Sequence, residues 1–137
     1  MFFATKNNTK VTAQRGGTAL LPCTVVSQSS ALVSWVRRQD FMLLTVDLET
    51  YISDERFLVE HLRHLGHWAL RIKSVRTEDE GLYECQLSVH PVQSVFVELT
   101  VVGKCVHMFV FFCFSSRRKD IDEWLHNPGK DNPIEQK

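Results

Sequence analysis

Residues 79–85 read Asp-Glu-Gly-Leu-Tyr-Glu-Cys and form the most informative stretch of this chain. Tyr83 and Cys85 fall on one face of an extended segment, because successive side chains in a strand point to opposite sides. Glu84 and Gln86 fall on the other face. Upstream, Cys23 lies 62 residues before Cys85, and Trp35 lies twelve residues after Cys23. The stretch therefore predicts a strand with one buried and one wetted face.

The same alternation extends on both sides of this stretch, from about Asn8 to Val102. Trp68, Leu70 and Ile72 share one face of their segment, for example. Turn signals recur about every 8–12 residues, and no segment has a helical period, which favours an antiparallel sandwich or barrel over a βαβ fold. The one-sided burial is typical of two packed sheets. The predicted strands are residues 9–12, 18–23, 32–36, 41–46, 56–60, 68–73, 83–89 and 95–102.

Composition excludes several function classes. The chain has 137 residues, with 16 Lys+Arg against 16 Asp+Glu, so it lacks the basic excess that nucleic-acid binding needs. None of its four cysteines forms a CxxC pair, so neither a zinc ribbon nor a thioredoxin motif is indicated. No nucleophile elbow or paired catalytic base is present, and we expect neither an enzyme nor a cofactor or small-molecule substrate.

The character of the sequence changes after Val102. We place one domain at 7–102 and expect residues 103–137 to form an irregular or disordered tail, such as a read-through intron would encode. The apolar run Cys105–Phe114 has ten residues, far fewer than the ~20 that span a bilayer. No secretory signal is visible at the start. We therefore expect that this chain does not itself encode membrane attachment.

The spacing of Cys23, Trp35 and the 79–85 stretch resembles the immunoglobulin signature, Cys…Trp…D-x-G-x-Y-x-C. The Cys23–Cys85 spacing and the number of predicted strands favour the variable type. The resemblance implies an all-β Greek-key sandwich of two antiparallel sheets with a Cys23–Cys85 disulfide between them. It also assigns structural roles in the core and at one end of the sandwich. The residues concerned are Trp35 on the disulfide, Tyr83 at the corner, Gly81 in the turn, and Arg56 with Asp79 in a salt bridge.

A closer resemblance is carried by five segments, which are Val33–Phe41, Leu44–Val46, Ser53–Phe57, Trp68–Lys73 and Gly81–Ser88. Together they look like the first immunoglobulin domain of the Dpr family (defective proboscis extension response). The likeness covers about residues 5–102. Family members are arthropod neuronal surface proteins that pair with Dpr-interacting proteins. The resemblance therefore implies an extracellular or plasma-membrane recognition module that binds a partner immunoglobulin domain in neuronal contact and synapse specification.

The resemblance further implies that the partner binds the sheet formed by strand G (95–102), strand F (83–89), strand C (32–36) and strands C′ and C″ (within 41–51). Alternation from Trp35 and Cys85 gives the outward positions on strands C and F. On strand C′ we predict Leu43 and Thr45 outward, with Leu44 and Val46 inward. The predicted partner-binding residues are Val36, Arg38, Leu43, Thr45, Gln86, Ser88 and His90.

Two local motifs carry further expectations, and two alternative functions remain open. Asn7-Asn8-Thr9 is an N-glycosylation triplet, which an extracellular fold makes a candidate at Asn7. His61, His64 and His67 flank a predicted turn, and residues three apart in a strand face opposite sides, so we expect no metal site there.

The alternative functions are an intracellular structural immunoglobulin domain of a muscle-type array, or a fragment of an innate-immune variable-type receptor.

Overall fold

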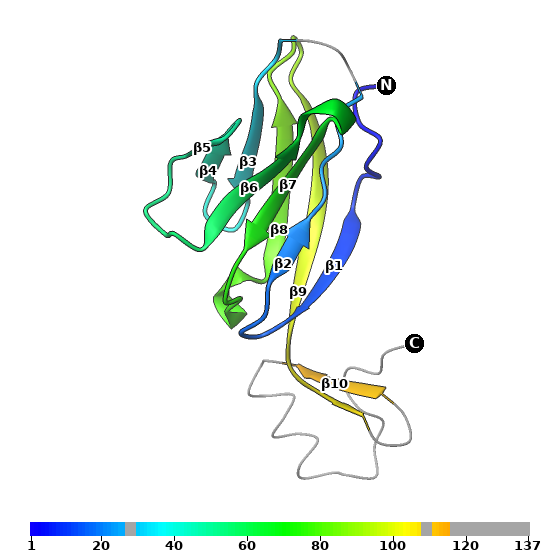
Figure 1. Cartoon of the computed structure of the whole chain (residues 1–137), viewed down its shortest axis with the longest axis vertical. Helices are drawn as coiled ribbons and strands as arrows, with labels where there is room; N and C mark the ends of the chain where they lie inside the picture. The colour runs from blue at the N-terminus through cyan, green and yellow to red at the C-terminus, as the bar shows by residue number, and fades with distance from the viewer. Residues whose placement is uncertain (27–29, 108–110, 116–137) are drawn as a thin grey trace.

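The computed structural model describes residues 1–26, 30–107 and 111–115, and they form two β-sheets (Figure 1). The larger sheet has the strand order β1-β9-β8-β3-β4-β5, with β10 paired to β9, and the smaller has the order β2-β7-β6. β1 runs parallel to β9, and the other pairs are antiparallel. The strands are β1 Thr9–Gln14, β2 Ala19–Leu21, β3 Val33–Arg37, β4 Met42–Val46, β5 Glu49–Thr50, β6 Phe57–Leu62, β7 His67–Ile72, β8 Gly81–Leu87, β9 Gln93–His107 and β10 Phe111–Ser115.

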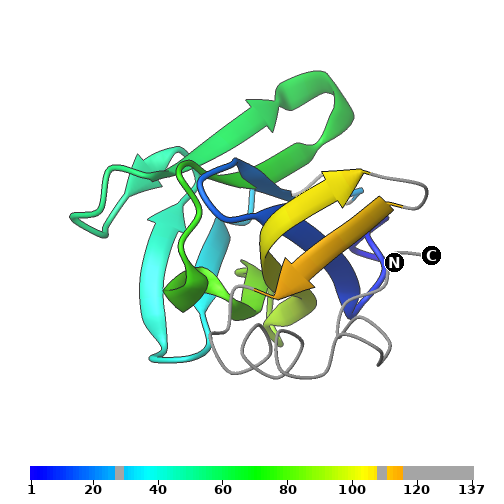
Figure 2. The ribbon, with the colours of Figure 1, turned by 90° about the horizontal axis from the view of Figure 1, so that it is seen from below.

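The two sheets pack face to face around one apolar core, and the view along the strands in Figure 2 separates the layers. Strands of both sheets alternate buried and more exposed side chains, as in β2, where Leu20 is exposed between two buried neighbours. Each buried face would expose its apolar area to water if the other sheet were absent, so neither sheet is stable alone. The all-β sandwich predicted from the sequence is confirmed.

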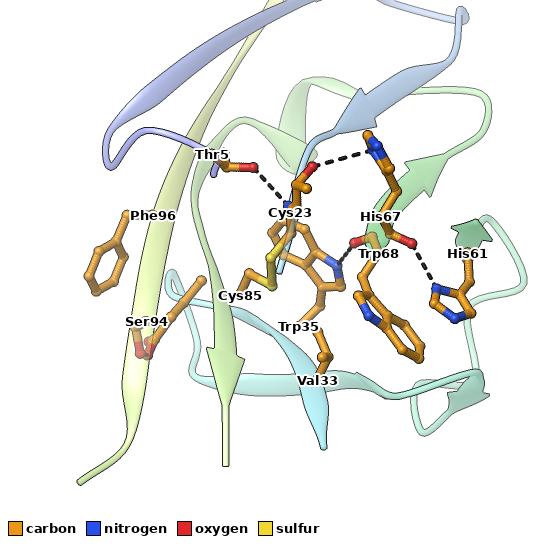
Figure 3. The surroundings of a disulfide bond; sticks show 12 residues. Thr5, Cys23, Val33, Trp35, His61, His67, Trp68, Cys85, Ser94 and Phe96 are labelled. Carbon is orange, nitrogen blue, oxygen red and sulfur yellow. Dashed lines mark hydrogen bonds between the residues drawn. A yellow bond between two sulfur atoms is a disulfide. The ribbon is translucent and has the colours of Figure 1, made fainter. Parts of the chain in front are cut away.

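A disulfide joins the sheets through the middle of this core (Figure 3). Cys23 follows β2, and Cys85 lies on β8 beside its cross-strand partner Trp35. Trp35 is fully buried, and its indole Nε1–H donates a hydrogen bond of 2.9 Å to the carbonyl oxygen of Trp68. A large ring is therefore buried without leaving its polar atom unpaired.

One end of the sandwich is closed by a group of hydrogen bonds around Asp79. The buried Tyr83 hydroxyl donates to the Asp79 carbonyl oxygen at 2.6 Å, and burial raises the pKa of that hydroxyl. Arg56 donates to both carboxylate oxygens of Asp79, at 2.6 and 2.9 Å, and these bonds raise the pKa of its guanidinium. Gly81 has φ +148°, and a Cβ there would collide with Gln39. These four residues take the positions that the signature implies.

The predicted orientation of β4 is wrong at Thr45. Thr45 is fully buried and pairs with the inward Trp35, whereas Leu43 pairs with Val36 on the other face. A β-bulge causes the difference, because Leu44 has no partner between these two pairs and is itself fully buried. The extra residue shifts the alternation by one position. Val46, predicted inward, pairs with Ser34 and is only partly buried.

Regular structure continues past the boundary predicted at Val102. β9 runs to His107, and its last part pairs antiparallel with β10, beyond the end of the sandwich in Figure 1. The expectation of an irregular tail is therefore wrong for 103–107 and 111–115, while 116–137 lie outside the described residues. In the part of the chain that the structure describes, no helix has the length and apolar character needed to cross a membrane.

Candidate functional site

The outward side of the larger sheet brings together most of the predicted partner-binding residues. The register aligns one row of side chains across four strands, since Leu43 pairs with Val36, Val36 with Glu84, and Glu84 with Phe96. A second row lies beside it and runs from Val46 through Ser34 and Gln86 to Ser94. We call this surface the outer face and define it by Val36, Arg38, Leu43, Glu84, Gln86, Ser94 and Phe96.

A buried carboxylate lies in the middle of the outer face. The Glu84 side chain is only 6% exposed and accepts three hydrogen bonds from its own chain. Arg38 Nη1 donates at 2.7 Å, Gln86 Nε2 at 2.8 Å and Ser94 Oγ at 2.6 Å. Burial alone would raise the pKa of this carboxyl group, but the three donors outweigh burial and hold it below its ordinary value. The carboxylate is therefore charged and saturated at neutral pH.

Arg38 presents the positive charge of this network to solvent. Its side chain is 35% exposed, and its guanidinium carbon lies 4.6 Å from the ring centroid of Phe41 and 5.5 Å from that of Phe96. Both distances are within the range of cation–π attraction. The two rings and Glu84 therefore fix the position of the one guanidinium on this face.

An apolar margin borders the outer face on the side of β4 and β5. Five large apolar side chains in the segment 41–51 are exposed by 39–69%, and we call them the β4–β5 edge. Isolated exposed apolar residues are ordinary, but a group of this kind beside a polar network is typical of a recognition surface. The residues are Phe41, Met42, Leu43, Leu48 and Tyr51.

The predicted residues outside the central rows have other positions. Ser88 and His90 are exposed beyond the end of β8, and the Ser88 hydroxyl accepts a hydrogen bond from the Leu32 amide. Thr45 lies in the core and cannot contact a partner. Sequence reasoning missed the burial of Glu84 and the contribution of Phe96. Alternation along 95–102 did contain the signal for Phe96, because its neighbours Val95 and Val97 point inward.

The three histidines lie on the opposite side of the sandwich, around the turn between β6 and β7. The His61 ring stacks on Trp68 with 3.6 Å between centroids, and its Nδ1 lies 2.8 Å from the His67 carbonyl oxygen (Figure 3). His67 Nδ1 lies 3.3 Å from the Thr24 hydroxyl. The Nδ1 atoms of His61 and His67 are therefore engaged in contacts within the protein. No cluster with metal-ligand composition occurs among the described residues.

Sequence comparison places the described domain in a known family. Residues 6–102 match the model of the immunoglobulin V-set domain. Cell adhesion molecule 2 of Rattus norvegicus is 32% identical over 94 residues, which are 68% of this chain and 21% of that protein. T-lymphocyte activation antigen CD86 of Mus musculus is 29% identical over 105 residues, 64% of this chain and 33% of that protein. The chain thus spans a third or less of these curated relatives.

Solved structures give a closer match. The crystal structure of Dpr11 IG1 bound to DIP-gamma is 43% identical in sequence, with a TM-score of 0.66, and the match covers 69% of this chain and 99% of that one. Dpr1 IG1 bound to DIP-eta IG1 is 34% identical with a TM-score of 0.69, covering 73% and 94%. The chain therefore belongs to the immunoglobulin V-set domain family, and within that family it is similar to the first immunoglobulin domains of Dpr proteins.

Proposed function

We propose that this chain is a cell-surface recognition module whose outer face binds an immunoglobulin domain of the DIP type, in neuronal cell–cell recognition and synapse specification. The observation that carries the proposal is an outer face with a three-donor carboxylate at its centre and the exposed apolar β4–β5 edge along its margin. Its similarity to Dpr domains solved in complex with DIP domains supports the same choice of partner.

The charge arrangement supports binding of another protein on this face. A buried carboxylate without partners would make docking unfavourable, because it would lose its remaining water on contact. Glu84 already has three donors, so a partner can cover it at little further cost. The partner is expected to supply apolar side chains opposite the β4–β5 edge and an acceptor opposite Arg38.

The Cys23–Cys85 disulfide favours this proposal over an intracellular structural domain. Disulfides form and persist in oxidising compartments and are rare in the cytosol. The curated relatives named above are a cell adhesion molecule and an activation antigen, which supports binding rather than catalysis as the activity. The expected location of the complete protein is the plasma-membrane surface or the extracellular space.

The test compares two leucines on opposite sheets. Leu43 on the outer face is 39% exposed, and Leu58 on β6 is 37% exposed, so Leu43→Asp and Leu58→Asp are matched in residue type and exposure. Surface plasmon resonance against a panel of DIP first domains should show at least about a tenfold loss of affinity for Leu43→Asp and little change for Leu58→Asp. Circular dichroism confirms that both variants fold.

A loss of affinity for Leu58→Asp but not for Leu43→Asp would place the binding surface on the smaller sheet. If neither the parent nor the variants bind any member of the panel, the DIP-type partner is rejected. Gln86→Ala provides a second probe, because it removes one donor from Glu84 and a polar group from the face. We expect it to weaken binding less than Leu43→Asp does.

A further inference from the structure

We propose that Asn7 carries an N-linked glycan and that this glycan lies beside the β9 margin of the outer face, leaving the β4–β5 edge open. The chain contains one N-x-S/T triplet, Asn7-Asn8-Thr9, so the position is unambiguous. The proposal that Asn7 is glycosylated does not depend on the function proposed above. The consequence for docking rests on the function proposed above.

The structure presents this triplet in an accessible turn. Asn7 and Asn8 are exposed and precede β1 directly. Asn8 has φ +62°, a left-handed conformation that asparagine tolerates better than most residues, and the Thr9 hydroxyl donates to the Lys6 carbonyl oxygen at 2.6 Å. A bulky substituent at Asn7 therefore meets solvent and requires no repacking of the core.

A hydrogen bond orients the Asn7 side chain. Its Oδ1 accepts from the Phe96 amide at 2.8 Å, and the Asn8 amide in turn donates to the Phe96 carbonyl oxygen at 2.8 Å. Oδ1 is thus held against β9, while Nδ2, the atom to which the sugar is joined, makes no hydrogen bond to the described residues. The fold fixes where the glycan begins and leaves the acceptor nitrogen available.

The same disulfide that joins the sheets indicates that the chain passes through the compartment where glycans are attached. A Cys23–Cys85 bond requires oxidising conditions such as those of the endoplasmic reticulum lumen. An exposed triplet in a domain of that compartment is an acceptor for the glycan-transferring enzyme. The fold and the modification therefore imply the same cellular route.

The position of Asn7 relative to the outer face gives the consequence. Phe96 belongs to the face, and Asn7 contacts its backbone from the side of β1. β4 is the third strand from β9 in the sheet order, which is about 14 Å at the usual strand spacing. A glycan at Asn7 therefore starts at the β9 margin, three strands away from β4, and we expect it to leave the β4–β5 edge open.

The first experiment measures occupancy. Residues 1–137 are expressed behind a secretion leader in eukaryotic cells and treated with peptide N-glycosidase, which converts a glycosylated asparagine to aspartate. We expect a mass loss for the parent and for Thr9→Ser, which keeps the triplet, and none for Asn7→Gln. Recovery of unmodified Asn7 from the secreted parent would overturn the proposal.

The second experiment moves the glycan. Leu48→Asn creates an N-x-T triplet with Glu49 and Thr50, so Asn7→Gln with Leu48→Asn transfers the sugar to the β4–β5 edge. Against a DIP first domain, the parent should bind within about threefold of its deglycosylated form, and the transferred glycan should abolish binding. Leu48→Gln in the same background is the unglycosylated control. A transferred glycan that leaves binding intact, or a tenfold gain on deglycosylating the parent, would overturn the assigned orientation.

Discussion

Replacing Glu84 by glutamine tests whether the polar network stabilises the outer face. The substitution preserves size but removes the negative charge that Arg38, Gln86 and Ser94 approach at 2.6–2.8 Å. Hydrogen bonds to charged groups each contribute roughly 1.5–3 kcal/mol. The glutamine can retain the Ser94 bond, and solvent screens the Arg38 pair because that side chain is 35% exposed. We therefore expect the free energy of unfolding to fall by about 2–4 kcal/mol at pH 7.

The dependence of this loss on pH follows from the pKa of Glu84. Its pKa in the folded domain is lower than the ordinary value of 4.5, so the charged network stabilises the fold fully above about pH 4.5. As the pH falls through the lower, folded pKa, the carboxylate takes up a proton and the stabilisation disappears. The parent and Glu84→Gln should therefore converge in stability in acid, once the pH lies below the folded pKa of Glu84.

Urea unfolding followed by circular dichroism at pH 7 and in acid measures both effects. Glu98→Gln is the matched control, because Glu98 points outward from the same strand as Ser94 but is exposed. It should change stability by less than about 0.5 kcal/mol. Equal stability of parent and Glu84→Gln at pH 7 would refute the network, and a gap that persists unchanged in acid would refute the charge as its cause.

Three further substitutions test the core. Thr45→Val should raise the free energy of unfolding by about 1 kcal/mol in urea titration, because the buried Thr45 hydroxyl makes no hydrogen bond among the described residues; a loss would reveal a hidden partner. Tyr83→Phe should lower the free energy of unfolding by about 1–3 kcal/mol, because it leaves the Asp79 carbonyl oxygen without its donor. Coinciding thermal melts of the parent and Tyr83→Phe would contradict this expectation. Cys23→Ala should lower the free energy of unfolding by about 2–5 kcal/mol, and non-reducing peptide mapping of the parent should recover Cys23 joined to Cys85.

The sandwich and its closed end were predictable because the deciding residues have specific chemistry. A tryptophan against a disulfide, and a tyrosine two residues before a cysteine, are required by contacts that few other residues can make. Arg56 and Asp79 are 23 residues apart in sequence, yet the signature places them together because a buried carboxylate needs a paired cation. Such contacts restrict the residue type at each position, so they can be recognised in the sequence even where strand propensities are weak.

The orientation of β4 was not predictable by the same means. Alternation assigns faces only while every residue has a cross-strand partner, and the unpaired Leu44 breaks that condition. Nothing in Met42–Val46 marks the bulge, since both Leu44 and Thr45 are acceptable at a buried position. The continuation of β9 to His107 was missed for a related reason, because its pairing with β10 depends on a register that composition does not reveal.

The burial of Glu84 shows most clearly what sequence could not supply, and it bears directly on recognition. Alternation places this carboxylate outward, where an isolated strand would leave it in water. Side chains from β8, β9 and the residue after β3 enclose it, so an outward charge becomes an internal one. The face is then left with one partly exposed cation, Arg38, between two rings and next to an apolar edge. A partner domain gains affinity from the apolar edge, and it is selected by whether it offers an acceptor at the position that Arg38 fixes.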